Sequence, residues 1–188
     1  MKDLNKLSKE IYEANASKGF HEEKYSLDHM ICLVISELME AVEADRKGRR
    51  ANIEYVKTLT KPTSKSLFDV LFKNGVKDSI EDEFADAVIR LLDTAGALEL
   101  NLKAIIKGDN LRYYGTQYAF NNRSLTENIY DIIDKYFRKK PLTIDAKISN
   151  MIFDIDILCE VMNIDLWQHI ELKMKYNSLR PYKHGKAY

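Results

Sequence analysis

The chain has 188 residues, enough for one domain with a well-buried core. Its 45% hydrophobic and 31% charged residues are typical of a globular protein and exclude a disordered or membrane-embedded chain. The formal net charge is zero, with 29 basic and 29 acidic side chains, so no overall field attracts nucleic acid or an anionic membrane. We therefore expect neither nucleic acid nor a membrane as a partner.

Cellular location follows from three further features. No apolar run reaches transmembrane length, and the polar, amphipathic residues 1–15 predict no secretory signal. Cys32 and Cys159 are isolated, each within an apolar run. This pattern favours buried free thiols in a reducing compartment over a disulfide or a zinc site. We expect a cytoplasmic protein.

The hydrophobic pattern is helical almost throughout. Proline and glycine are scarce, three and seven residues, and few segments alternate with period two, so we predict an all-α helical bundle in a single domain. The basic segment 49–77 is less periodic and should hold one short helix at most. Ser79 should cap the helix that follows, with Asp82 completing a variant capping box. The expected helices cover 4 to about 18, 29–47, 67–72, 79–102, 124–137, 143–162 and 165–179.

A faint internal echo relates two parts of the chain. Residues 26–35 match residues 124–133 at an offset of 98, and residues 98–105 match residues 162–169 at an offset of 64. At these offsets Glu37, Glu40, Glu83 and Asp86 fall on Lys135, Arg138, Lys147 and Asn150. A duplicated two-helix unit whose second copy lost its acids and a chance match of short helical patterns both stay open.

The run from Met30 to Val42 is almost uniformly apolar, yet it carries two carboxylates. Glu37 and Glu40 are three residues apart and lie about 60° apart on one helical face, which they share with apolar neighbours. Because burying unpaired carboxylates is costly, a cation is expected beside them.

A second acidic pair, Glu83-x-x-Asp86, begins 43 residues after Glu40. If the two helices pack antiparallel, all four carboxylates converge, and an all-oxygen ligand set favours Mg²⁺, with Mn²⁺ as a substitute. Taken alone, Glu83 could simply complement its helix dipole and Asp86 could be solvated. Arg90 and Asp93 on the same stripe should either pair within the helix or support the metal ligands.

Cations and amide donors gather on one face near the C-terminus. Such groups suit phosphate oxygens, although a solvated basic tail is the alternative. If this face lies beside a metal site, a nucleotide polyphosphate is the simplest ligand that accounts for both features. The residues concerned are Lys173, Tyr176, Asn177 and Arg180, followed by Lys183, His184 and Lys186.

Three ordered motifs, ISELMEA, EDEFADAVIRLLD and KMKYNSLRPYKHGK, resemble the MazG-like family of all-α nucleoside triphosphate pyrophosphohydrolases. The resemblance covers residues 4–48, 79–102 and 163–187, a MazG-like four-helix core, and leaves 49–77 and 103–162 as additions. It implies Mg²⁺-dependent cleavage of a nucleoside triphosphate between the α- and β-phosphates, giving a nucleoside monophosphate and pyrophosphate. It also implies a homo-oligomer of two or more chains.

The resemblance further implies roles for individual side chains. Glu37 or Glu40 would act on the attacking water, and the whole acidic set would bind the metal. Phe20 and His21 follow the position where relatives often place an aromatic residue near the base. The implied metal ligands are Glu37, Glu40, Glu83 and Asp86, and the implied phosphate-binding residues are Lys173, Asn177, Arg180 and Lys186.

Three other functions compete with this interpretation. A di-iron carboxylate bundle is disfavoured because its Glu-x-x-His motif occurs nowhere in the chain. A nucleic-acid binder using the lysines of 49–77 is disfavoured by the zero net charge. A non-catalytic nucleotide-sensing or scaffolding module that retains the metal site stays open, and pyrophosphate release would separate it from an enzyme.

Overall fold

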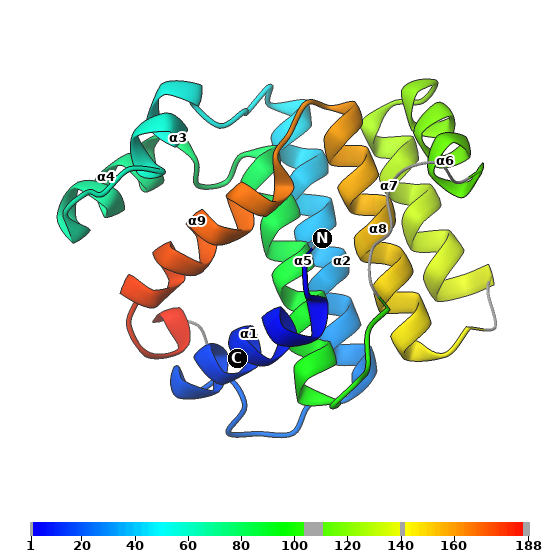
Figure 1. The fold of residues 1–188 in the computed structure, drawn as a ribbon, viewed down its shortest axis with the longest axis horizontal. Helices are drawn as coiled ribbons and strands as arrows, with labels where there is room; N and C mark the ends of the chain where they lie inside the picture. The colour runs from blue at the N-terminus through cyan, green and yellow to red at the C-terminus, as the bar shows by residue number, and fades with distance from the viewer. Residues whose placement is uncertain (1, 104–110, 140–141, 186–188) are drawn as a thin grey trace.

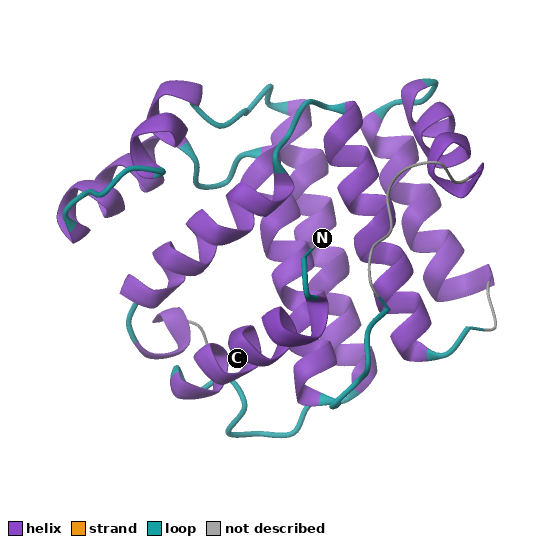
Figure 2. Ribbon diagram, viewed as in Figure 1, coloured by secondary structure: helices purple, strands orange, loops and turns teal. Residues whose placement is uncertain are grey.

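The computed structural model describes residues 2–185 except 104–110 and 140–141. Within these residues every regular element is a helix and no strand is found (Figures 1 and 2). The prediction of an all-α helical bundle is confirmed. In the same part of the chain, none of the helices combines the length and apolarity needed to cross a bilayer.

Most helices begin at a side chain that accepts a hydrogen bond from the backbone N–H groups of the first turn, which would otherwise lack partners. The capping residues are Asp3, Ser26, Asn52, Ser64, Ser79, Ser124 and Asp165. The helices are α1 (Leu4–Ser17), α2 (Leu27–Arg46), α3 (Ile53–Leu59), α4 (Lys65–Gly75), α5 (Ile80–Ala97), α6 (Leu111–Asn121), α7 (Leu125–Ile133) with the π-helical η1 (Asp134–Lys139), α8 (Ile144–Val161), α9 (Leu166–Leu179) and the 3₁₀ turn η2 (Tyr182–Gly185).

Helix α5 is the centre of the fold. It contacts α1, α2, α8 and α9, and its Phe84, Val88 and Leu92 side chains are fully buried. Helices α2, α5, α8 and α7 each contact the next and close into a four-helix bundle, whereas α1 and α9 pack mainly on α5 (Figure 1). Residues 103–162, expected as an addition, thus supply half of the bundle.

Segment 49–77 forms two helices, so the prediction of a single short helix at 67–72 is wrong. Helices α3 and α4 pack on each other, and α4 also packs on α9. Between them lies a second, smaller core of buried side chains from all three helices. Its members are Val56, Leu59, Phe68, Phe72, Val76, Leu172 and Tyr176. This core attaches the whole segment to α9.

Two local expectations also need correction. Helix α6 forms although no helix was expected between the predicted helices 79–102 and 124–137, and it packs against α8. Cys32 is exposed, contrary to the prediction of two buried thiols, whereas Cys159 is buried as predicted. Neither cysteine forms a disulfide.

Two ion pairs link the helices of the internal echo. Arg90 Nε on α5 lies 2.5 Å from Glu37 Oε1 on α2. At the offsets of the echo, Glu37 corresponds to Lys135 and Arg90 to Asp154, and Lys135 forms an ion pair with Asp154. The same two positions therefore pair in both halves with their charges exchanged. A duplicated unit would produce this pattern, and the duplication stays a prediction.

Candidate metal centre

Three of the four predicted metal ligands come together where α2 packs against α5. One carboxylate oxygen from each of Glu37, Glu83 and Asp86 lies within 4.8 Å of the other two. Glu37 and Glu83 are only 4% and 3% exposed, and Asp86 is half-buried. The two acidic motifs, far apart in sequence, thus form one cluster.

Glu40 lies at the solvent edge of this cluster. It is exposed, although it follows Glu37 by less than one helical turn. Its negative charge nevertheless contributes to raising the pKa of both Glu37 and Glu83, which places it within electrostatic reach of them. The 60° between neighbouring motif positions is enough to move one carboxylate out of the helix contact.

Burial and mutual repulsion oppose the ionisation of all carboxylates in the cluster. Burial raises the pKa of Glu83 to about 9, and the adjacent Asp82 and Asp86 charges add to this effect. Burial and Asp86 also raise the pKa of Glu37, against the lowering effect of Arg90. Among the described residues, none donates a hydrogen bond to the Glu83 carboxylate. This buried acid therefore lacks the partner that would stabilise its ionised form.

Lys173 enters the cluster from α9. Its Nζ lies 2.8 Å from both carboxylate oxygens of Asp82 and 2.7 Å from Asp86 Oδ2, and the residue is 4% exposed. Burial alone would lower the pKa of Lys173, but Asp86 and Asp82 raise it above its ordinary value. The lysine predicted to bind phosphate is thus a buried, protonated partner of the acids.

Asp82 is the main residue of the site that the sequence did not identify. Ser79 Oγ accepts a hydrogen bond from the Asp82 backbone N–H as an N-cap, but the carboxylate does not complete the predicted capping box. It accepts from the Asp78 N–H at 3.0 Å and from Lys173 instead. Burial raises the pKa of Asp82 to about 6, and Lys173 opposes the rise.

Arg90 and Asp93 do not pair with each other within α5, so the first of the two alternatives is wrong. Arg90 donates to Glu37, and Asp93 Oδ1 lies 2.9 Å from His21 Nε2. Arg90 therefore supports a cluster carboxylate directly. His21 is held at the same time by Asp93 and by the Tyr12 ring, whose centroid is 4.7 Å away.

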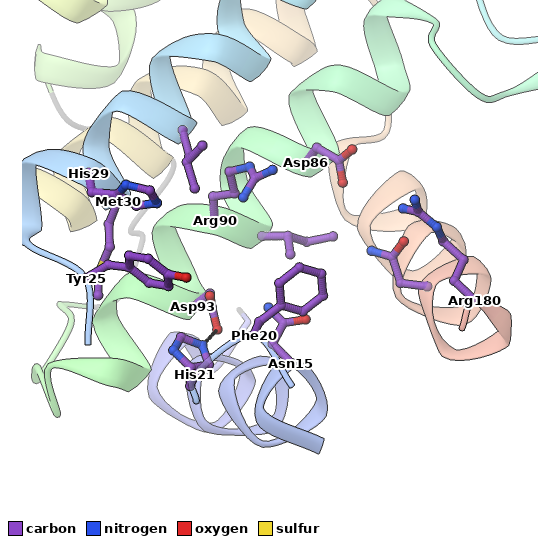
Figure 3. Close-up of a pocket in the computed structure, with 13 residues that line it drawn as sticks. Asn15, Phe20, His21, Tyr25, His29, Met30, Asp86, Arg90, Asp93 and Arg180 are labelled. Atoms are coloured by element: carbon purple, nitrogen blue, oxygen red, sulfur yellow. Dashed lines mark hydrogen bonds and ion pairs between the residues drawn. The ribbon is translucent and has the colours of Figure 1, made fainter. Parts of the chain in front are cut away.

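A pocket lined by Asp86, one member of the cluster, also holds residues predicted to bind base and phosphate (Figure 3). Phe20 and His21 line it from the loop after α1, Asp86 from α5, and Asn177 and Arg180 from α9. The Asn177 Oδ1 atom is buried and has no hydrogen-bond partner among the described residues. The structure thus gathers these predicted residues around one cavity.

Two other basic residues of the C-terminal motif have different positions. Lys183 Nζ lies 3.4 Å from Glu22 Oε2 and forms an ion pair with this carboxylate. Lys186, predicted to bind phosphate, lies outside the described residues.

Comparison of the chain with protein-family profiles, curated proteins and solved structures found no match. The MazG-like resemblance therefore rests on the three sequence motifs alone.

Proposed function

We propose that the chain is a Mg²⁺-dependent nucleotide pyrophosphohydrolase of MazG-like type, which converts a (d)NTP to a (d)NMP and pyrophosphate. The observation that carries this proposal is the convergence of Glu37, Glu83 and Asp86, because Asp86 also lines a pocket together with Asn177 and Arg180. Carboxylates that bind a divalent ion and donors that bind phosphate are the groups needed for phosphoryl transfer.

The residues present suit Mg²⁺. The donor set consists of carboxylate oxygens on two packed helices, and hard divalent cations prefer such ligands. The Glu83 carboxylate is buried without a hydrogen-bond donor among the described residues, and a bound cation would supply the missing partner. Glu37, Glu83 and Asp86 would hold the ion, with Glu40 at the solvent edge. Bound Mg²⁺ would polarise phosphate oxygens and lower the pKa of a coordinated water.

The protein groups divide the remaining tasks. Arg90 holds one oxygen of Glu37, which leaves this carboxylate less available as a base. Exposed Glu40 is the better candidate to accept a proton from the attacking water. Asn177 and Arg180 would donate hydrogen bonds to phosphate oxygens as charge develops on the leaving pyrophosphate. Phe20 offers an aromatic face to the base.

Pyrophosphate release from a panel of ribo- and deoxyribonucleoside triphosphates, with Mg²⁺ or with EDTA, tests the proposal. Turnover should require the metal and fall by about a hundredfold or more in Glu83→Gln, since one ligand is lost. Glu43→Gln, on α2 beyond the acidic motif and in ion pairs with Arg46 and Lys47, is the matched control.

Two results would count against an enzyme. Metal-independent turnover retained by Glu83→Gln would contradict the assigned site. Nucleotide binding without pyrophosphate release from any nucleotide would favour the sensing or scaffolding module instead. A homo-oligomeric state and a cytoplasmic location stay predictions, which sedimentation and cell fractionation can test.

A further inference from the structure

Lys173 uses its whole hydrogen-bonding capacity within the acidic cluster. An ammonium group has three N–H donors. Three carboxylate oxygens surround the Lys173 Nζ atom, two from Asp82 at 2.8 Å each and one from Asp86 at 2.7 Å. No donor of Lys173 is therefore left for a phosphate oxygen while both contacts persist.

Segment 49–77 encloses this ion pair. The Phe72 ring of α4 has its centroid 5.7 Å from Lys173 Nζ, and it stacks on Tyr176 of α9 with centroids 4.3 Å apart. Phe72 and Tyr176 are both buried in the smaller core. Exclusion of water strengthens the attraction between the ammonium and its carboxylates.

Both ends of segment 49–77 attach to the first turn of α5. At its start, Arg50 Nε lies 2.7 Å from Glu81 Oε1, and the Ala51 N–H donates to Glu81 Oε2 at 2.9 Å. Directly after its end, the Asp78 N–H donates to Asp82. The segment that seals Lys173 is thus tied to the carboxylate that holds it.

We propose that Asp82 is a positioning residue that keeps Lys173 in the cluster as a resident cation, and that Lys173 competes with the divalent metal ion for Asp86. This step rests on the proposed function, because it takes Asp86 as a metal ligand. The ion and the Lys173 ammonium then compete for the Asp86 carboxylate, and Asp82 retains the ammonium when the ion binds.

The two contacts of Lys173 support this division of roles. Asp82 is 1% exposed and binds the ammonium through both oxygens, whereas Asp86 is half-buried, lines the pocket and binds it through one. Asp86 is therefore the partner that an ion entering from the pocket can reach. In the absence of the ion, Lys173 neutralises part of the negative charge. Substitution of Lys173 should therefore mainly change the affinity for the metal ion, unlike substitution of a residue that binds phosphate.

Titration with Mn²⁺ alone, without nucleotide, tests this inference by electron paramagnetic resonance on the full chain. Lys173→Met keeps the apolar stem and removes the competing charge, so Mn²⁺ should bind at least about tenfold more tightly. A phosphate-binding lysine would leave Mn²⁺ affinity unchanged. Lys175→Met, an exposed neighbour on α9 whose ammonium lies over the Phe68 ring, is the matched control and should match the wild type.

Asp82→Asn separates positioning from simple loss of charge. In the wild-type background it leaves Lys173 with Asp86 as its only carboxylate partner, so Mn²⁺ affinity should fall by about tenfold. In the Lys173→Met background the same substitution should have a much smaller effect, which a double-mutant cycle measures. The double variant also removes both members of the buried pair. It should therefore fold even if Lys173→Met alone does not.

The outcomes are distinguishable from failure of the proposed function. Unchanged or weaker Mn²⁺ binding in folded Lys173→Met, or equal effects of Asp82→Asn in both backgrounds, would overturn the resident-cation role while leaving the metal site intact. Absence of Mn²⁺ binding in every variant would overturn the metal site and the competition together. Binding by Lys173→Met but not by the wild type would support the competition in its strongest form.

Discussion

Arg90 and Glu37 join the two helices that carry the candidate metal centre. The guanidinium Nε lies 2.5 Å from Glu37 Oε1, and the Glu37 side chain is only 6% exposed. Removing one member of such a pair leaves a buried charge without a partner, which is more costly than removing both. This relationship leads to the first prediction.

Arg90→Met should lower the free energy of unfolding by about 2 kcal/mol, less than for a fully buried pair because Arg90 is partly exposed. Adding Glu37→Gln should recover part of this loss, since the unpaired carboxylate is then neutral. Urea unfolding followed by circular dichroism measures both values. A double variant less stable than either single variant would contradict the assignment.

The stability of the metal-free protein should depend on pH through Glu83. Its pKa rises from an ordinary 4.5 to about 9 on folding, so the folded state holds a proton that the unfolded state releases. Between these values the free energy of unfolding should fall as pH rises, and the dependence should level off above pH 9. Asp82, raised from 3.8 to about 6, adds an effect of the same sign at lower pH.

Urea unfolding in EDTA across pH 5 to 9 measures this dependence. Glu83→Gln should flatten it, because glutamine does not titrate in this range. Saturating Mg²⁺ should stabilise the wild type more at high pH than at low pH, since the ion binds the deprotonated site. Stability that rises with pH in EDTA would be evidence against the burial of an uncompensated acid.

Phe72→Ala should loosen segment 49–77 without melting the four-helix bundle. Phe72 is fully buried in the smaller core, and truncation of such a side chain costs about 3 kcal/mol. Hydrogen exchange by mass spectrometry should show faster exchange in α3 and α4, with α5 and α8 still protected. Leu67→Ala, at a 46% exposed position of α4, is the control. Uniformly faster exchange over the whole chain would show that the segment is not a separate cooperative unit.

Phe20→Ala should weaken binding of the base without affecting phosphate chemistry. Stacking of a base on an aromatic ring contributes about 1 to 3 kcal/mol, so the KM for a nucleotide should rise by about tenfold with little change in kcat. Inorganic tripolyphosphate, if hydrolysed, should be unaffected. Tyr118→Ala removes an aromatic side chain that is 75% exposed on α6 and outside the pocket, so it is a suitable control. A fall in kcat alone would place Phe20 elsewhere in the mechanism.

Local sequence signals predicted the elements that carry the site. Ser79 is a cap that can be recognised in the sequence, and the apolar period of α5 is strong. The weaker patterns failed. Helix α6 contains Gly115 and depends on its packing against α8, and α3 is stabilised by the core that it shares with α4 and α9. Such tertiary contacts override local preference.

The same distinction applies to the site. Glu37, Glu83 and Asp86 were predictable because acids repeated at one spacing within apolar helices are costly to bury unless they share a cation. The contact between Asp82 and Lys173 joins residues 91 positions apart, and nothing in either local motif indicates it. The exposure of Glu40 was equally hidden, because the packing of α2 on α5 decides which of two neighbouring carboxylates is buried.

Anomalous diffraction from crystals grown with Mn²⁺ tests most directly the central claim that acids of α2 and α5 form a divalent-cation site. We expect a strong anomalous peak at coordination distance from the Glu37, Glu83 and Asp86 carboxylates, with Asp86 turned away from Lys173. A map without a peak at this cluster, at Mn²⁺ concentrations that support turnover, would contradict the claim.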